Sequence, residues 1–274
     1  MEVTPDAWRL IDTGLLDGPA NMAVDEALLL CFDPATSLPV LRLYGWQPPA
    51  LSLGRFQDAA RVLDLGRCRA AGIPVVRRIT GGGVIYHADE LTYSIVCAPH
   101  HLPPTASIKD SFRILTSFLL GFYRALALDA RYAADVCPGQ RLGERTAFCF
   151  AGKESCDILI GGTKKIGGNA QRRLKNVIFQ HGSIPLRDRV GEGVVFLRES
   201  PPRISDETIS LAGAGITNEA PELKALLAES FRSVMGATLR TGRLSGTERE
   251  AVDALLAKYR DDCWNYRGEL PGRS

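Results

Sequence analysis

Strand-like segments dominate two stretches of the chain and helix-like segments flank them, and this distribution restricts the fold to one class. The patterns of apolar residues predict strands at residues 8–12, 39–44, 50–53, 75–78, 84–86, 91–98, 156–160, 165–167 and 176–184. Apolar residues spaced by three and four predict helices at residues 19–31, 57–71, 107–126, 222–235 and 246–259. We therefore expect an α+β fold, with a mixed, largely antiparallel sheet flanked by helices. Residues 136–146 and 187–215 are predicted to be connections.

Composition excludes several classes of protein. The 274 residues allow one large domain or two small ones, and the net charge of +2 argues against general nucleic-acid binding. No apolar run approaches the ~20 residues that a membrane helix needs, and the first residues lack the pattern of a signal peptide. The 7 cysteines are odd in number and form no Cys-x-x-Cys pair. We expect reduced thiols in a cytoplasmic protein, without disulfides or a zinc site.

The first segment that could carry chemistry is rich in glycine. Residues 77–87 read Arg-Arg-Ile-Thr-Gly-Gly-Gly-Val-Ile-Tyr-His. Three glycines after a strand expose backbone N–H groups and let a ligand approach closely, and the arginines add positive charge. The same pattern is also typical of a tight hairpin turn with solvated arginines. It is neither a P-loop nor a dinucleotide fingerprint, because no Gly-Lys-Ser/Thr follows and the next element is a strand.

Two further segments could contribute reactive side chains. Cys149 follows a polar loop, where a nearby cation could make its thiol a nucleophile, although a cysteine between aromatic residues is usually a small buried apolar group. Residues 161–173 read Gly-Gly-Thr-Lys-Lys-Ile-Gly-Gly-Asn-Ala-Gln-Arg-Arg, so Lys165 could lie against a ligand or could be solvated at a hairpin tip. His87 and the two acids after it have poor geometry for a metal, and we expect no metal site.

Six motifs follow one another along the chain. They are Asn-Met-Ala-Val-Asp-Glu at 21–26, Arg-Leu-Tyr-Gly-Trp-Gln-Pro-Pro-Ala-Leu-Ser-Leu-Gly at 42–54, Arg-Arg-x-Thr-Gly-Gly at 77–82, His-x-x-Glu-Leu-Thr-Tyr-Ser at 87–94, Lys-x-x-Gly-x-Ala-Gln at 165–171 and Gln-His-Gly-Ser-Ile at 180–184. This combination resembles the lipoate-protein ligase and octanoyltransferase family, which shares a fold with biotin protein ligases. The second motif is similar to the family's first hairpin. The resemblance implies one catalytic domain over residues 1–274, with a short helical C-terminal extension at about 220–266.

Within that family, the chain is most similar to the cysteine-dependent, LipM-like octanoyltransferases. In that branch a Cys-Phe pair shortly precedes the lysine motif, and Cys149-Phe150 stands at this place. The form of the motif at 87–94 and the short C-terminal tail also favour the transferases. One departure is Gly83-Val84, which is closer to the ligase form because the transferases commonly have arginine after the second glycine.

The resemblance implies an enzyme of lipoate biosynthesis that needs no cofactor. It would move octanoyl from acyl carrier protein to Cys149 as a thioester, with Lys165 assisting, and then to a lysine of a lipoyl-carrier protein such as glycine cleavage H protein or a 2-oxoacid dehydrogenase E2. The residues that it implies for the acyl pocket are Arg77, Thr80, Gly81, Gly82, Gly83, His87, Gly168, Ala170 and Gln171. The basic residues that could dock the partners are Arg78, Lys164, Arg172 and Arg173.

Three other activities are compatible with the sequence. One is an ATP-dependent lipoate ligase, which would need ATP and magnesium but not Cys149. Another is an amidotransferase that moves octanoyl between lipoyl domains. The last is a non-catalytic lipoyl-domain binder, against which the presence of both Cys149 and Lys165 argues.

Overall fold

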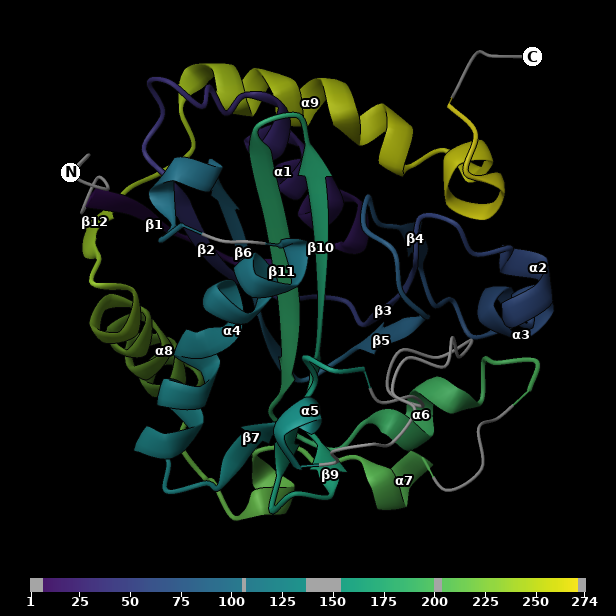
Figure 1. Cartoon of the computed structure of the whole chain (residues 1–274). Coiled ribbons are helices and arrows are strands. Elements are labelled where there is room, and N and C mark those ends of the chain that lie inside the picture. Colours follow the sequence, from purple (N-terminus) through teal and green to yellow (C-terminus); the bar gives the residue numbers. More distant parts are fainter. Residues whose placement is uncertain (1–6, 105–106, 137–153, 200–203, 271–274) are drawn as a thin grey trace.

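The largest sheet is mixed, as the sequence predicts. The computed structural model describes residues 7–104, 107–136, 154–199 and 204–270 (Figure 1). In this part of the chain the largest sheet has six strands, in the order β10 (Gly168–Leu174), β11 (Val177–Pro185), β6 (Glu90–Cys97), β2 (Val40–Trp46), β1 (Ala7–Leu16) and β12 (Thr238–Thr241). Strand β1 runs parallel to both of its neighbours, and the remaining pairs are antiparallel.

Two three-stranded sheets carry the segments with candidate chemistry. Strand β3 (Ala50–Leu53) lies between β4 (Val75–Arg77), which is parallel to it, and β5 (Ile85–His87), which is antiparallel. The other sheet is antiparallel and contains β7 (Ala130–Tyr132), β8 (Ile158–Ile160) and β9 (Lys164–Lys165). The first of these sheets holds the glycine-rich segment and the second holds Lys165.

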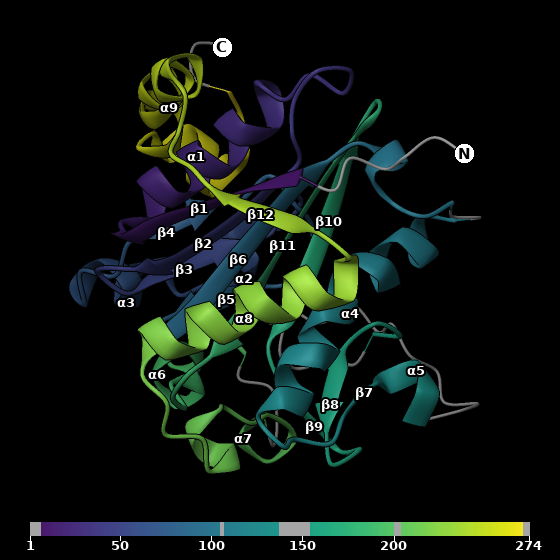
Figure 2. The ribbon, with the colours of Figure 1, turned by 90° about the vertical axis from the view of Figure 1, so that its left-hand side faces the viewer.

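Helices cover both faces of the large sheet. Figure 2 shows α1 (Gly18–Leu30) and α9 (Gly246–Tyr259) on one side, and α4 (Ile108–Ala125) and α8 (Ala220–Met235) on the other. Alternate residues of β2 divide between the two cores: Leu41 and Leu43 pack on the α4 and α8 side, whereas Val40 and Tyr44 pack on the α1 and α9 side. This alternation is what a strand with both faces buried requires. None of the described helices is long and apolar enough to cross a membrane.

The structure corrects two predicted elements. Strands β2 and β3 do not form a hairpin, because they belong to different sheets. The helix predicted at 57–71 is two short helices, α2 (Ala59–Val62) and α3 (Leu65–Ala70). They are separated because Leu63 is buried in an extended conformation and bridges to Leu197, while the Asp64 side chain caps the second helix.

Several elements were absent from the sequence prediction. Strand β10 has a mostly polar sequence, and β12 is a short strand between two strong helices, so neither has the apolar pattern by which the other strands are predicted. The connection predicted at 187–215 contains α6 (Val190–Val194), α7 (Ile204–Glu207) and the 3-10 turn η3 (Ala212–Ala214). The other short elements are η1 (Pro99–His101), α5 (Ala133–Val136) and the π-helical turn η4 (Cys263–Arg267). Of the loop predicted at 136–146, all but its first residue lies outside the described residues.

The predicted C-terminal extension is built into the domain. Helix α8 packs on α4, β12 joins the edge of the large sheet, and α9 packs on α1. The turn η4 then reaches β4, where the Trp264 indole donates a hydrogen bond to the carbonyl of Arg77 at 2.9 Å. Residues 220–266 therefore help to place the glycine-rich segment.

Candidate active site

The glycine-rich segment forms a turn between β4 and β5, and hydrogen bonds from Arg78 hold this turn in place. The guanidinium of Arg78 donates to the carbonyls of Gly81 at 2.8 Å and Gly83 at 2.7 Å, and to that of Ser52 on β3 at 3.0 Å. Arg78 is buried. The prediction that Arg78 docks a partner is therefore wrong, because its charged end is inside the protein and holds the turn.

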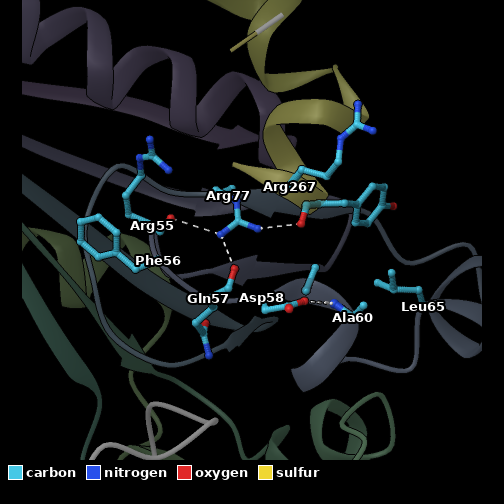
Figure 3. Close-up of a pocket in the computed structure, with 10 residues that line it drawn as sticks. Arg55, Phe56, Gln57, Asp58, Ala60, Leu65, Arg77 and Arg267 are labelled. Atoms are coloured by element: carbon cyan, nitrogen blue, oxygen red, sulfur yellow. Dashed lines mark hydrogen bonds between the residues drawn. The ribbon is translucent and has the colours of Figure 1, made fainter. Parts of the chain in front are cut away.

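Arg77 holds the loop that lies beside this turn. Its guanidinium donates to the carbonyl of Gln57 at 2.6 Å (Figure 3). It also donates to the carbonyls of Gly54 at 3.0 Å and of Tyr266 in η4 at 3.0 Å. Burial and the neighbouring Arg55 lower the pKa of Arg77. These contacts tie the loop after β3 to the C-terminal turn.

The loop and the glycine turn touch through their backbones. A Cβ atom on Gly54 would lie 2.0 Å from the carbonyl oxygen of Gly82, and Gly82 itself has a φ of 96°. The backbone N–H of Arg55 donates to the carbonyl of Thr80 at 2.7 Å. Glycine is thus required at position 54 for a close approach, and at position 82 for a conformation that other residues rarely adopt.

His87 lies in a buried polar network beneath the turn. Its Nε2 is 2.7 Å from Ser52 Oγ, its Nδ1 is 2.8 Å from Glu90 Oε1, and its ring stacks on Trp46 with centroids 3.8 Å apart. The arrangement has the geometry of a Ser-His-Glu triad. Ser52 is 0% exposed, however, so its hydroxyl is closed to a substrate. The network therefore positions the turn, and Glu90 extends it by accepting a hydrogen bond from Ser183 on β11 at 2.7 Å.

A second histidine reaches the turn from β11. His181 Nε2 is 2.7 Å from the hydroxyl of Thr80, and His181 Nδ1 is 3.8 Å from Asp25 Oδ2. Burial, with the nearby charges of Arg78 and Arg42, lowers the pKa of His181 well below its usual value. His181 is therefore neutral at physiological pH, and one ring nitrogen is available as an acceptor.

Asp25 anchors this second network. Its carboxylate accepts hydrogen bonds from Arg42 at 2.7 Å, Tyr44 at 2.8 Å and Ser94 at 2.8 Å. Arg42 also donates to the side-chain oxygen of Asn21 at 2.7 Å. Both charges are buried and fully hydrogen-bonded, which is the condition under which a buried ion pair is tolerated.

Lys165 forms a buried ion pair. Its Nζ lies 2.7 Å from Asp157 Oδ2, and the side chains of Lys165 and Asp157 are only 3% and 9% exposed. The backbone N–H of Glu154 donates to the same carboxylate at 2.7 Å, which fixes its orientation. Cys149, the predicted nucleophile, lies outside the described residues.

The rest of the lysine motif borders the two histidine networks. Gly167 has a φ of 70°, and a Cβ there would lie 2.0 Å from the carbonyl oxygen of Ser183. In the pairing of β10 with β11, Gly168 faces Ser183 and Ala170 faces His181. Strand β11 therefore brings together Thr80, His87, Gly168 and Ala170, while Gln171 lies one position further along, where its side chain donates to Gln180 at 3.0 Å.

The predicted docking residues have different surroundings. Lys164 is exposed. Arg172 is half-buried and donates to the carbonyl of Ile79 at 3.1 Å, at the start of the glycine turn. Arg173 is exposed and donates to Ser111. In the part of the chain that the structure describes, no three His, Cys, Asp or Glu residues are grouped as a metal site would need.

A family model described as the lipoyl protein ligase A/B catalytic domain matches residues 17–240. The chain belongs to this family. Among curated relatives, "Octanoyltransferase LipM" of Kyrpidia tusciae is 39% identical over 95% of this chain and 98% of its own length, and the protein of the same name from Symbiobacterium thermophilum is 36% identical over 95% and 98%.

Solved structures of lipoyl protein ligases share the fold. A lipoate-protein ligase A bound with ATP superposes with a TM-score of 0.79 at 24% identity, over 96% of this chain and 98% of the other. The bi-partite lipoate protein ligase of Thermoplasma acidophilum superposes with a TM-score of 0.80 at 22% identity, over 98% and 99%. The α+β class predicted from the sequence is confirmed.

In this member of the lipoyl protein ligase A/B family, four polar residues belong to the site that the sequence does not predict there. They are Asp25, Ser52, Asp157 and His181. The motifs contain three of them but do not say which strand faces meet. Asp157 could have been noticed because it stands between Cys156 and the apolar run Ile158-Leu159-Ile160 of a predicted strand. An acid that is buried in such a place needs a partner.

Proposed function

We propose that this protein is an octanoyltransferase of lipoate biosynthesis, which passes octanoyl from an acyl carrier protein to Cys149 and then to a lysine of a lipoyl-carrier protein. The observation that carries the proposal is the similarity to proteins named octanoyltransferase LipM, at up to 39% identity among those cited, along nearly the whole of both chains. The acceptor class is supported by the family and by the archaeal ligase, whose structure was determined as part of a lipoylation system with an E2 lipoyl domain.

In the first half-reaction the thiolate of Cys149 would attack the carbonyl carbon of the donor thioester. A new carbon–sulfur bond forms, the bond to the donor's sulfur breaks, and the released carrier thiolate takes up the proton that Cys149 lost. One thioester replaces another, so the step needs no ATP. The ammonium of Lys165 is the cation that would lower the pKa of the Cys149 thiol and stabilise the oxyanion of the tetrahedral intermediate.

In the second half-reaction a neutral lysine amine of the acceptor would attack the Cys149 thioester. The amide forms, the carbon–sulfur bond to Cys149 breaks, and the proton that the amine loses balances the released Cys149 thiolate, which is returned to the thiol through solvent. Formation of an amide from a thioester is downhill. The buried networks of His87 and His181 support both steps by fixing the glycine turn and β11, since a site held by secondary structure keeps its geometry during the reaction.

The other candidate is an ATP-dependent ligase. Structures of lipoate-protein ligases share this fold, but a likeness at 22–24% identity shows the fold alone. The two activities differ in the need for ATP and in the need for Cys149, so a single experiment separates them.

Intact-protein mass spectrometry, after mixing with octanoyl-acyl carrier protein without ATP, tests the proposal. We expect an octanoyl increment that hydroxylamine removes and that Cys149→Ser abolishes. The matched control is Cys263→Ser, which removes a half-buried thiol whose sulfur lies 2.6 Å from the guanidinium of Arg267 and which could be acylated adventitiously. No increment, together with lipoate transfer that requires ATP, would establish a ligase instead.

A further inference from the structure

A cationic rim lies on the outer side of the glycine turn. The backbone N–H of Arg55 donates to the carbonyl of Thr80, and the guanidinium of Arg172 donates to the carbonyl of the preceding residue, Ile79, at 3.1 Å. These two contacts place Arg55 and Arg172 at the same edge of the turn, although 117 positions separate them in the sequence. They come from the loop after β3 and from the edge strand β10.

The charges of these two arginines are not cancelled by carboxylates. Arg55 donates to the carbonyl of Gly268 at 3.2 Å and stacks over Trp264 at 4.6 Å, and neither Arg55 nor Arg172 forms an ion pair with any described residue. Burial, with the nearby charges of Arg172 and Arg55, lowers the pKa of Lys258, and the Lys258 ammonium is paired with Glu26 at 2.5 Å. The rim therefore has a local positive charge that the net charge of +2 for the whole chain does not indicate.

An apolar anchor and a cavity adjoin the rim. Phe56 is 89% exposed, more than any other large hydrophobic residue in the described ranges. It lies next to a cavity of about 560 Å³ between the loop and η4, which is lined by Arg55, Phe56, Asp58, Arg77, Tyr266 and Arg267 among others (Figure 3). An exposed aromatic side chain beside arginines is the composition typical of the centre of a protein–protein interface.

We propose that Arg55, Phe56 and Arg172 form the docking surface for the donor, an acidic acyl-carrier domain that presents its acyl thioester on an arm with a phosphodiester. This inference rests on the proposed function. The charge of the arm decides between the two partners: guanidinium groups attract a phosphodiester, whereas they repel the ammonium group of an acceptor lysine. The rim adjoins the turn that is expected to line the acyl pocket, so a docked arm would enter beside the glycines.

The test compares two donors for the self-acylation step. One is octanoyl-acyl carrier protein, and the other is the thioester of octanoate with free pantetheine, which lacks both the protein and the phosphate. For Arg55→Glu we expect the ratio of the two kcat/KM values, carrier-bound over carrier-free, to fall at least tenfold, and for Phe56→Ala about fivefold. Arg232→Glu on α8, which makes the same change of charge at an exposed arginine, is the control and leaves the ratio within twofold.

Binding of unacylated holo-carrier, measured by calorimetry, gives a second readout that does not depend on turnover. We expect weaker binding to Arg55→Glu and a smaller dependence on salt than in the parent protein. An unchanged ratio and unchanged binding would overturn the proposal, as would an equal loss with both donors, which would place Arg55 in acyl transfer itself.

Two other outcomes are also decisive. If enzyme acylated with the carrier-free thioester transfers octanoyl to a lipoyl domain more slowly in Arg55→Glu, while donor binding is normal, the surface docks the acceptor and the assignment is wrong. If the parent protein forms no adduct with either donor, the proposed function fails. The docking surface is then tested by calorimetry alone, through the difference in carrier binding between the parent protein and Arg55→Glu.

Discussion

Replacement of Asp157 by Asn removes the counter-ion of a buried lysine, and its cost can be worked out from the geometry. The Asp157–Lys165 pair is 2.7 Å long with side chains 9% and 3% exposed, and loss of one member of such a pair costs about 3–5 kcal/mol. This cost in folding free energy has an upper limit, because Lys165 can lose its proton instead. A lysine with a reference pKa of about 10.4 is deprotonated at pH 7 at a cost of about 5 kcal/mol. Asn still accepts the hydrogen bond from Glu154, so we expect about 3 kcal/mol, or a Tm lower by roughly 6–12 °C.

The cost should also decrease as the pH rises. If Lys165 is neutral in folded Asp157→Asn, the unfolded state binds one more proton than the folded state, so the stability of the variant increases with pH relative to the parent. The cost of deprotonating Lys165, which is the upper limit, falls by about 1.4 kcal/mol for each pH unit and is about 2 kcal/mol at pH 9. A neutral Lys165 cannot stabilise an oxyanion, so the rate of self-acylation should fall at least tenfold at pH 7.

Urea unfolding at pH 7 and pH 9 measures this difference. The matched control is Asp129→Asn, which breaks the ion pair with Arg131 on β7 in the same small sheet. Those side chains are 57% and 60% exposed, so the cost should be at most about 1 kcal/mol at either pH. A cost for Asp157→Asn that equals that of the control would refute the reasoning, because Lys165 would then have no need of the carboxylate.

Three other substitutions test separate parts of the structure. Gly54→Ala should reduce octanoyl transfer at least tenfold, because the new methyl would lie 2.0 Å from a backbone oxygen of the glycine turn, whereas Gly246→Ala, with open space around it, should have little effect. His101 accepts a hydrogen bond from a backbone amide through Nδ1, and burial lowers its pKa from 6.5 to about 4. Between these two values the unfolded state binds more protons than the folded state, so the stability decreases as the pH is lowered from 6.5 to 4. Denaturant titrations at pH 7 and pH 4 should show about 3 kcal/mol less loss in His101→Asn, which keeps an acceptor but does not titrate. Thermal unfolding should show that Asp25→Asn costs about 3–5 kcal/mol because a buried guanidinium loses its partner, and that Tyr44→Phe, which removes one hydrogen bond to the same carboxylate, costs only about 1 kcal/mol.

The sequence was most informative where local pattern and tertiary packing require the same residues. The helix predicted at 107–126 is α4, and its ends agree within one residue because Ser107 caps it and one face is strongly apolar. The prediction at 57–71 failed for the opposite reason. Leu63 leaves the helix to be buried against Leu197, and this contact lies more than a hundred residues away in the sequence. Local propensity gives no indication of such a contact.

The site shows the same division. Thr80, His87 and Lys165 could be found by motif because each lies in a short run with a recognisable composition. Their partners could not be found in this way. Asp25 and Ser52 are polar residues inside a helix and a strand, and Asp157 directly precedes β8. Each becomes part of the site only through a pairing between distant segments. Arg78 shows the reverse error, since a charged residue beside glycines indicated a surface and is in fact buried under the turn.

Strand β11 makes the fold and the site dependent on one register. Successive side chains of a strand alternate between faces, so His181 and Ser183 both point toward the glycine turn and its network, where they meet Thr80 and Glu90. Gly182 points the other way, and a Cβ there would lie 2.6 Å from the Tyr93 ring. A slip of one residue would turn the side chains of His181 and Ser183 away from the site. It would also replace Gly182 by a residue with a side chain, which would clash with the Tyr93 ring. Changes that loosen the pairing of β11 with β6 or β10 should therefore reduce activity before they unfold the domain, because both histidine networks depend on this register.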